Sequence, residues 1–211
     1  MTTQLEDILA GVLENRQLLD HPFYQRWEAG VIRRDELAHY AEQYRYFEVM
    51  FPTFLRSLCA QLPKGPIRNL VEANLADEVS PPSHVDLFEQ FARAYGAREV
   101  PISPAMSRLV ESYFALLQRG PASSLAGLWA YESQGGAVAV SKADGLIRHY
   151  EAPSEAVAFW AAHGLIEGDH AKWTLEALTF LGPDIVEVEF GASLIGEAWW
   201  NFLDERELLV V

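Results

Sequence analysis

The sequence has a single cysteine, Cys59, and only three lysines among its 211 residues. One cysteine excludes an internal disulfide and is typical of a reducing compartment, so we expect a cytoplasmic protein. Cys59 lies in the apolar run FLRSLCAQL, which favours a buried small side chain over a reactive thiol. Because lysines are so few, a role for Lys64, Lys142 or Lys172 can be tested by single substitutions.

Basic residues and long apolar runs are also scarce. The chain has 16 lysines and arginines against 30 aspartates and glutamates, whereas nucleic-acid-binding proteins carry clustered basic residues. No apolar run is long enough to cross a bilayer, and the N-terminal stretch MTTQLEDILAGVLENRQ is amphipathic and acidic rather than signal-like. There is no P-loop, dinucleotide-binding glycine motif or serine elbow. We therefore expect small-molecule partners, and neither nucleic acid nor membrane.

Helical periodicity runs through nearly the whole chain. Apolar positions recur at intervals of three and four in LEDILAGVLENRQLL, LVEANLADEV and LIGEAWWNFLDERELLVV. Half of the residues are hydrophobic, which is enough for one domain with a full core, and no internal repeat or linker interrupts the pattern. The sequence therefore predicts a single all-α bundle over residues 1–211.

Proline and glycine mark the expected helix boundaries. The one segment that alternates like a strand, IVEVEF at 185–190, follows Gly182-Pro183 and is interpreted as the start of the last helix. Pro52 is expected to kink the helix that contains it. The predicted helices span 3–18, 22–29, 34–61, 66–79, 84–95, 104–119, 122–150, 154–181 and 184–208.

A triplet of polar residues stands out in the stretch FWAAHGLIEGDHAKW. His163, Glu167 and His170 lie at i, i+4 and i+7, which puts Glu167 and His170 within about 40° of the direction of His163 on one helix face. Two imidazoles and a carboxylate suit a first-row transition metal. Alone, such a triplet is more often a solvated polar stripe, and a metal site in a helical bundle draws its ligands from several facing helices.

Two other places supply similar side chains. Glu132 is a lone carboxylate after an apolar turn in SLAGLWAYESQGG, and a buried carboxylate needs a cation or hydrogen-bond donors near it. Glu78 and His84 flank the Pro-Pro break in NLADEVSPPSHVDLF. Glu132 has a simpler interpretation as a satisfied core carboxylate, and His84 as a helix N-terminal residue. Together with the triplet they would suit two iron ions, or one iron and one manganese, with positions open for dioxygen.

A second Glu-x-x-His pattern competes with the one at Glu167 and His170. Glu36 and His39 have the same spacing, which is the ferritin-like di-iron signature. However, Glu36 follows residues 33–35, Arg-Arg-Asp, in what we expect to be an exposed first helical turn. Glu36 and His39 are therefore predicted to lie at the surface.

Four segments in a fixed order carry a family resemblance over nearly the whole chain: LLDHPFYQRWEAGVIRRDELAHYAEQY, NLADEVSPPSHVDLFEQF, LWAYESQGGAVAVSKADGL and HGLIEGDH. On these segments the chain resembles the haem-oxygenase-like all-α superfamily that includes TenA thiaminases and the PqqC enzyme. It looks most like the family of the Chlamydia protein associating with death domains (CADD). The resemblance implies a haem-oxygenase-like di-metal oxidase that uses dioxygen and an external reductant. It also leads us to expect a homodimer.

The resemblance implies six metal ligands, which would fall on Glu78, His84, Glu132, His163, Glu167 and His170. The family member compared has aspartate where this chain has Glu167, which exchanges one carboxylate for another. The stretch between Glu78 and His84 is also one residue shorter here, which leaves Asp77 as an alternative ligand. We favour Glu78, because NLADE aligns with the NL-x-DE of the family.

CADD-like proteins are implicated in making p-aminobenzoate for folate without the usual chorismate route, with the protein's own tyrosine as the source of the ring. The resemblance puts this tyrosine at Tyr24, a second functional tyrosine at Tyr40 and the amino-group donor at Lys142. Without the resemblance, Tyr24 would be interpreted as a core residue and Lys142 as a surface charge.

Three alternatives are open at this point. The di-metal site is compatible with catalytic oxidation of a small amino acid or fatty acid. Metal-free chemistry of the TenA kind needs a nucleophilic cysteine in Cys-x-Trp-x-Tyr, but here Gly127 precedes Trp129 and Tyr131, so the nucleophile is missing. An acidic helical protein that binds a partner without catalysis is the third.

Overall fold

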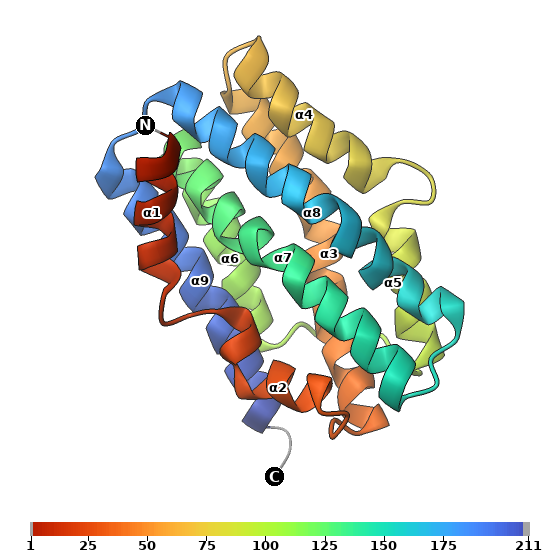
Figure 1. The fold of residues 1–211 in the computed structure, drawn as a ribbon. Coiled ribbons are helices and arrows are strands. Elements are labelled where there is room, and N and C mark those ends of the chain that lie inside the picture. The colour runs from red at the N-terminus through yellow and green to blue at the C-terminus, as the bar shows by residue number, and fades with distance from the viewer. Residues whose placement is uncertain (1, 209–211) are drawn as a thin grey trace.

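The structure is a computed structural model that describes residues 2–208. In this range the chain forms nine α-helices and a short 3-10 helix, η1, and no strand (Figure 1). The elements are α1 (Thr2–Leu13), η1 (Leu18–Asp20), α2 (Pro22–Glu28), α3 (Arg34–Gln61), α4 (Pro66–Val79), α5 (His84–Ala94), α6 (Pro104–Arg119), α7 (Pro121–His149), α8 (Ser154–Leu181) and α9 (Ile185–Leu208).

From α2 onward, the helix boundaries agree with the predicted ones to within one residue. The agreement has a local cause, because α2, α4, α6 and α7 each carry proline in their first turn. Proline fits there because the first-turn N–H groups have no partner within the helix. The segment 185–190 is helical, as expected from its position after Gly182-Pro183. Pro52 lies inside α3, and the expected kink stays a prediction.

The first helix is shorter than predicted, because α1 ends at Leu13 rather than near residue 18. The side-chain amide of Gln17 donates to the Leu13 carbonyl at 3.1 Å, which satisfies one of the free acceptors at the helix end. The chain then turns so that the backbone N–H of Leu18 donates to the side chain of Gln134 at 2.7 Å. This tertiary contact attaches Leu18 to α7. The periodicity of the sequence does not predict such a contact.

Helix α7 lies at the centre of the bundle and packs against both α8 and α9 (Figure 1). On its far side α8 contacts α4 and α5, and both of these also pack against α3. The core between these helices is rich in aromatic side chains, with Trp160 close to Tyr44, Phe88 and Phe91. Helices α3, α4, α5, α7 and α8 therefore enclose one region, and it contains the predicted metal ligands.

The prediction that Glu36 lies at the surface is wrong, since it is only 5% exposed. Its carboxylate accepts from the backbone N–H of Arg33 at 3.2 Å and forms an ion pair with Arg26. Glu36 thereby caps α3 and links it to α2. These two interactions account for the burial of Glu36 without a metal. His39 is half-buried.

Two smaller expectations can be checked against the same structure. Cys59 is buried, as predicted, and burial raises the pKa of its thiol to about 11, which makes it a poor nucleophile. Among residues 2–208, none of the helices has an apolar stretch that would reach across a bilayer.

Candidate metal centre

The six predicted ligands come from four helices and are all buried, none being more than 5% exposed. Helix α4 provides one, α5 one, α7 one and α8 three, in the order Glu78, His84, Glu132, His163, Glu167 and His170. Six polar side chains withdrawn from water in one region are costly unless each has a hydrogen-bond or ionic partner. The solvated-stripe interpretation of the α8 triplet is therefore wrong.

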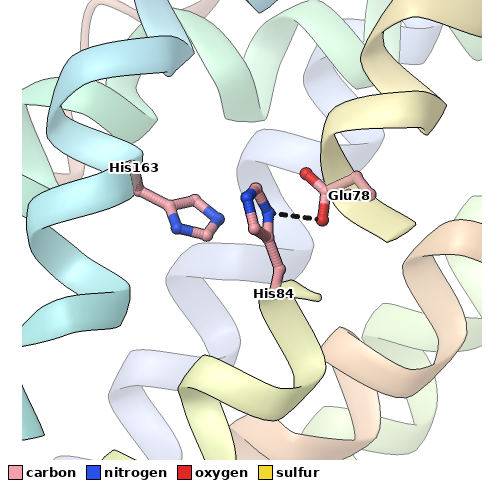
Figure 2. Close-up of side chains that lie close together, drawn as sticks. All are labelled: Glu78, His84 and His163. Carbon is pink, nitrogen blue, oxygen red and sulfur yellow. Dashed lines mark hydrogen bonds and ion pairs between the residues drawn. The ribbon is translucent and has the colours of Figure 1, made fainter. Parts of the chain in front are cut away.

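Three of the six form a tight cluster. One ligand atom from each of Glu78, His84 and His163 lies within 4.8 Å of the others, and their side chains converge from three helices (Figure 2). Nδ1 of His84 is 2.7 Å from Oε2 of Glu78. Nδ1 of His163 is 3.0 Å from the Phe159 carbonyl, which makes it the protonated nitrogen and leaves Nε2 free to bind a cation.

The position of His84 follows from a local signal. Ser83 caps α5, because its hydroxyl accepts from the backbone N–H of Asp86 while the Asp86 carboxylate accepts from the backbone N–H of Ser83. This capping box makes His84 the first residue of α5, so its ring faces the end of α4, where Glu78 lies.

The rest of the α8 triplet contains two buried polar atoms without a hydrogen-bond partner within residues 2–208. Oε1 of Glu167 is 3.8 Å from Nε2 of His163, whereas Oε2 of Glu167 is buried and has no hydrogen-bond partner among the described residues. The same is true of Nδ1 of His170. Buried atoms of this kind are rare in folded proteins, and both are good ligands for iron or manganese. The donor set therefore fits a metal.

Glu132 differs from the other carboxylates because both of its oxygens accept hydrogen bonds. Thr174 donates to Oε2 at 2.6 Å, and the side-chain amide of Asn74 donates to Oε1. Each oxygen keeps a further lone pair, so these bonds orient the carboxylate without excluding a metal.

The charges and burial of the predicted ligands also favour a bound cation. Burial raises the pKa of Glu167 well above its usual value, and the charges of Glu132 and Glu78 raise it further. Burial likewise raises the pKa of Glu132 to about 8. The pKa of His163 is lowered, first by burial and then by His84. Carboxylates that repel one another beside neutral imidazoles are stabilised in their charged form by divalent metal ions.

Asp77 and Glu78 occupy different positions around the site. Glu78 belongs to the tight cluster with His84, whereas Oδ2 of Asp77 is 3.1 Å from Nε2 of His170. The Asp77 side chain is 44% exposed, while Glu78 is buried. A carboxylate that accepts from the outer nitrogen of a histidine orients the ring and leaves the inner nitrogen, here Nδ1 of His170, for the metal.

The three residues that the family resemblance singled out lie together. Nζ of Lys142 donates to the hydroxyl of Tyr40 at 2.6 Å, and that hydroxyl is 3.1 Å from the hydroxyl of Tyr24. The interpretation of Lys142 as a surface charge is wrong, because it is 2% exposed. Its Nζ lies 4.0 Å from the ring centroid of Trp160 and 4.6 Å from that of Tyr24. Burial lowers the pKa of Lys142 well below its usual value, which favours the neutral amine.

A small cavity lies between Tyr24 and Lys142 of this cluster and one predicted metal ligand, His163. Its volume is about 10 Å³, room for roughly one water molecule. His163 lies on its wall together with Tyr24 and Lys142. The remaining lining residues are Leu18, Tyr44, Tyr131, Gly135, Val138, Ala139, Trp160 and Trp199.

Sequence reasoning missed one buried carboxylate in this region, Glu48. It follows Tyr40 and Tyr44 at intervals of four along α3, so the three share a helix face. Burial raises its pKa well above the usual value, as does the charge of Glu78, while Lys142 acts in the opposite direction. Glu48 therefore interacts electrostatically with Glu78, a predicted ligand, and with Lys142. Its charge within the apolar run YFEVMFPTFL was the available signal.

The structure also explains why the thiaminase nucleophile is missing. A Cβ added at Gly127 would lie 2.4 Å from Leu116 and 2.8 Å from Ile195, both of which are buried core residues. Gly127 therefore packs against α6 and α9, and a cysteine there would need the core to rearrange.

The family described as "Iron-containing redox enzyme" matches residues 38–184, a range that contains all six predicted ligands. The chain belongs to this family. The match confirms the predicted oxidoreductase class, and the donor set described above is one that iron uses.

Individual relatives agree with the family match. A protein named 4-aminobenzoate synthase from Chlamydia pneumoniae is 32% identical, over 96% of this chain and 94% of its own. A domain with a heme oxygenase-like fold from Shewanella denitrificans has a TM-score of 0.79 at 15% identity, covering 100% of this chain and 93% of that one. A CADD-like protein from Nostoc punctiforme has a TM-score of 0.75 at 16% identity, covering 97% of both chains. The predicted haem-oxygenase-like fold is confirmed.

Proposed function

We propose that this protein makes 4-aminobenzoate (p-aminobenzoate), with its own Tyr24 as the source of the ring and Lys142 as the source of the nitrogen. Two facts support the proposal. The Chlamydia pneumoniae relative carries the name 4-aminobenzoate synthase and aligns over nearly the full length of both chains. Tyr24 and Lys142 also line one cavity with His163, so the atoms to be joined lie beside the candidate metal centre.

The tyrosine side chain has the substitution pattern of the product. In 4-aminobenzoate the amine and the carboxyl group are para to each other, as the hydroxyl and Cβ are in tyrosine. The conversion breaks the ring C–O bond of Tyr24, with the oxygen leaving as water, and forms a bond between that ring carbon and Nζ of Lys142. The Cε–Nζ bond of Lys142 then breaks as Cε is oxidised to an imine and hydrolysed to an aldehyde, which leaves the nitrogen on the ring as a free amine. The Cα–Cβ bond of Tyr24 also breaks and Cβ is oxidised to the carboxyl level. Dioxygen is the oxidant and is reduced to water with help from an external reductant.

We propose that the metal is a pair of ions, two irons or one iron and one manganese. When bound, such a pair supplies the activation of dioxygen. The residues that would hold it are Glu78, His84, Glu132, His163, Glu167 and His170. The free Nδ1 of His170 and Oε2 of Glu167 support this set, because both are buried ligand atoms without another partner among the described residues.

Lys142 is suited to deliver its nitrogen. A neutral amine keeps a lone pair for attack on an oxidised ring, and the lowered pKa of Lys142 favours that form. Its hydrogen bond to Tyr40 fixes the amine, whose Nζ lies 4.6 Å from the centroid of the Tyr24 ring. The aromatic side chains around this cluster exclude water, which protects a reactive ring from side reactions.

The size of the cavity is the observation that carries the proposal. A volume of about 10 Å³ is at the lower limit for one water molecule, whereas a cavity that holds benzene has about 150 Å³. The cavity between His163, Tyr24 and Lys142 therefore has no room for an external amino acid or fatty acid. Among the tyrosine rings around the Lys142 amine, the ring of Tyr24 is the nearest, with its centroid at 4.6 Å, and it also lines the cavity.

Isotope labelling tests the proposal directly. The protein is produced with ring-¹³C tyrosine and ε-¹⁵N lysine, loaded with iron without oxygen, and then given dioxygen and a reductant. We expect 4-aminobenzoate that carries both labels and does not exceed one molecule per chain, measured by mass spectrometry. Unlabelled product, or many turnovers per chain on an added amino acid or fatty acid, would contradict it.

The contact between Asp77 and His170 yields a separate prediction about metal affinity. Asp77→Ala removes the acceptor that orients the ring, so we expect iron to bind about 10–100-fold more weakly. At saturating iron the variant should still reach the metal content of the wild type. The measurement is a titration of the apoprotein with ferrous iron, followed by elemental analysis.

The matched control is Glu72→Ala, which removes an exposed carboxylate from the same helix. Its iron affinity should equal that of the wild type. If Asp77→Ala lost one metal even at saturating iron, Asp77 would be a ligand itself, and the assignment of Glu78 would be overturned.

A further inference from the structure

Two adjacent glycines in the middle of α7, Gly135 and Gly136, both face Glu167 of α8. A Cβ built on Gly136 would lie 3.4 Å from Cβ of Glu167, an ordinary van der Waals contact. A Cβ built on Gly135 would lie 3.0 Å from Cδ and 3.1 Å from Oε2 of Glu167. Only Gly135 is therefore in contact with the carboxylate group itself.

Glycine within a helix needs a reason, because it destabilises the helix relative to alanine. Neither glycine has a positive φ that would require it, since both lie within regular α7. At Gly136 the space for a methyl group is present. At Gly135 the Glu167 carboxylate occupies the space that a methyl group would need. Glycine at this position therefore allows the carboxylate to lie where it does.

The carboxylate of Glu167 is positioned by packing rather than by hydrogen bonds. It is buried, its Oε1 is 3.8 Å from Nε2 of His163, and its Oε2 has no hydrogen-bond partner among the described residues. A methyl group on residue 135 would push Cδ and Oε2 away by a few tenths of an ångström or change the rotamer. Metal–ligand distances tolerate a deviation of only about 0.2 Å from their usual values, so such a shift of the carboxylate affects metal binding more than packing.

We propose that Gly135 is a positioning residue for the metal centre, because its bare Cα lets the carboxylate of Glu167 lie against α7 and reach the metal. The inference rests on the proposed two-metal function and assigns a role to a residue with no ligand atom of its own. Gly135 also lines the cavity that contains Tyr24 and Lys142. Gly135 thus contacts the Glu167 carboxylate on one side and the cavity with Tyr24 and Lys142 on the other.

The test compares Gly135→Ala with Gly136→Ala, the same change one residue further along the same helix. After anaerobic loading, elemental analysis should give about two metals per chain for the wild type and for Gly136→Ala. Gly135→Ala should retain about one, because the ion that Glu167 serves is lost. The thermal midpoint of the metal-free protein should not fall in either variant, since alanine favours the helix.

A second substitution separates a steric effect on the carboxylate from a general packing defect. Glu167→Asp shortens the side chain by one methylene and withdraws the carboxylate from residue 135. In the Gly135→Ala background this change should restore the second metal at least in part. A packing defect would leave the double variant at one metal.

Failure of this inference can be told apart from failure of the proposed function. A wild-type protein that binds no metal after loading would remove the basis of both. A wild type with two metals and a Gly135→Ala variant that also holds two would overturn the role of Gly135 alone. So would a loss of metal accompanied by a lower midpoint than that of Gly136→Ala.

Discussion

Replacing Tyr24 by phenylalanine is expected to abolish 4-aminobenzoate formation while both metals stay bound. The substitution removes the hydroxyl from the ring carbon at which nitrogen must enter, so product is lost. The metals stay bound because Tyr24 is not among the proposed ligands. Folding should survive, because the change removes a single hydrogen bond to Tyr40, worth about 1 kcal/mol. Product is measured by mass spectrometry and metal by elemental analysis on the same sample.

Tyr113→Phe is the matched control for this substitution. Tyr113 is another fully buried tyrosine, and its hydroxyl accepts from Nε1 of Trp199 rather than from a residue of the lysine cluster. This variant should form product at the wild-type level. Full product from Tyr24→Phe with normal metal content would show that the ring comes from somewhere else.

The second large effect is expected for Lys142→Met, which keeps the apolar chain and removes the amine. No product should carry nitrogen from the protein, and total 4-aminobenzoate should fall to background. The fold should be retained, because methionine fills a similar volume among the surrounding rings. Lys172→Met, at an exposed position on α8, is the matched control and should leave product unchanged.

The same substitution has a pH signature in stability. The pKa of Lys142 is lowered well below 10.5 in the folded protein. Between that lowered value and 10.5 the unfolded chain binds one proton more than the folded chain, so the free energy of unfolding of the wild type rises with pH in this window. Lys142→Met should lack this rise and should unfold at a higher temperature at neutral pH. A lower midpoint for Lys142→Met would contradict the neutral buried amine.

Much of the fold can be predicted from local signals. Proline at the first turns and glycine after α8 fix helix ends through neighbouring residues alone, which is why most boundaries agree to within one residue. The exception is α1, which ends at Leu13; the chain then turns to Leu18, whose backbone N–H donates to the side chain of the distant Gln134. Local periodicity carries no information about such a partner.

The candidate site divides in the same way. Spacing on α8 put His163, Glu167 and His170 on one face, and the break before His84 indicated its position at a helix start. Spacing on a single helix does not say which neighbours face that helix. The different positions of Asp77 and Glu78, adjacent on α4, depend on how α4 lies against α5 and α8.

The sequence by itself determined the all-α class, nearly all helix ends and the residue types of a metal site, because these depend on neighbours along the chain. Only the tertiary structure decided that Lys142, Glu36 and Glu48 are buried, and that the cavity is small. Burial and partnership are properties of pairs of helices far apart in sequence. The role of a charged residue such as Lys142 can therefore be assigned only when the positions of the surrounding helices are known.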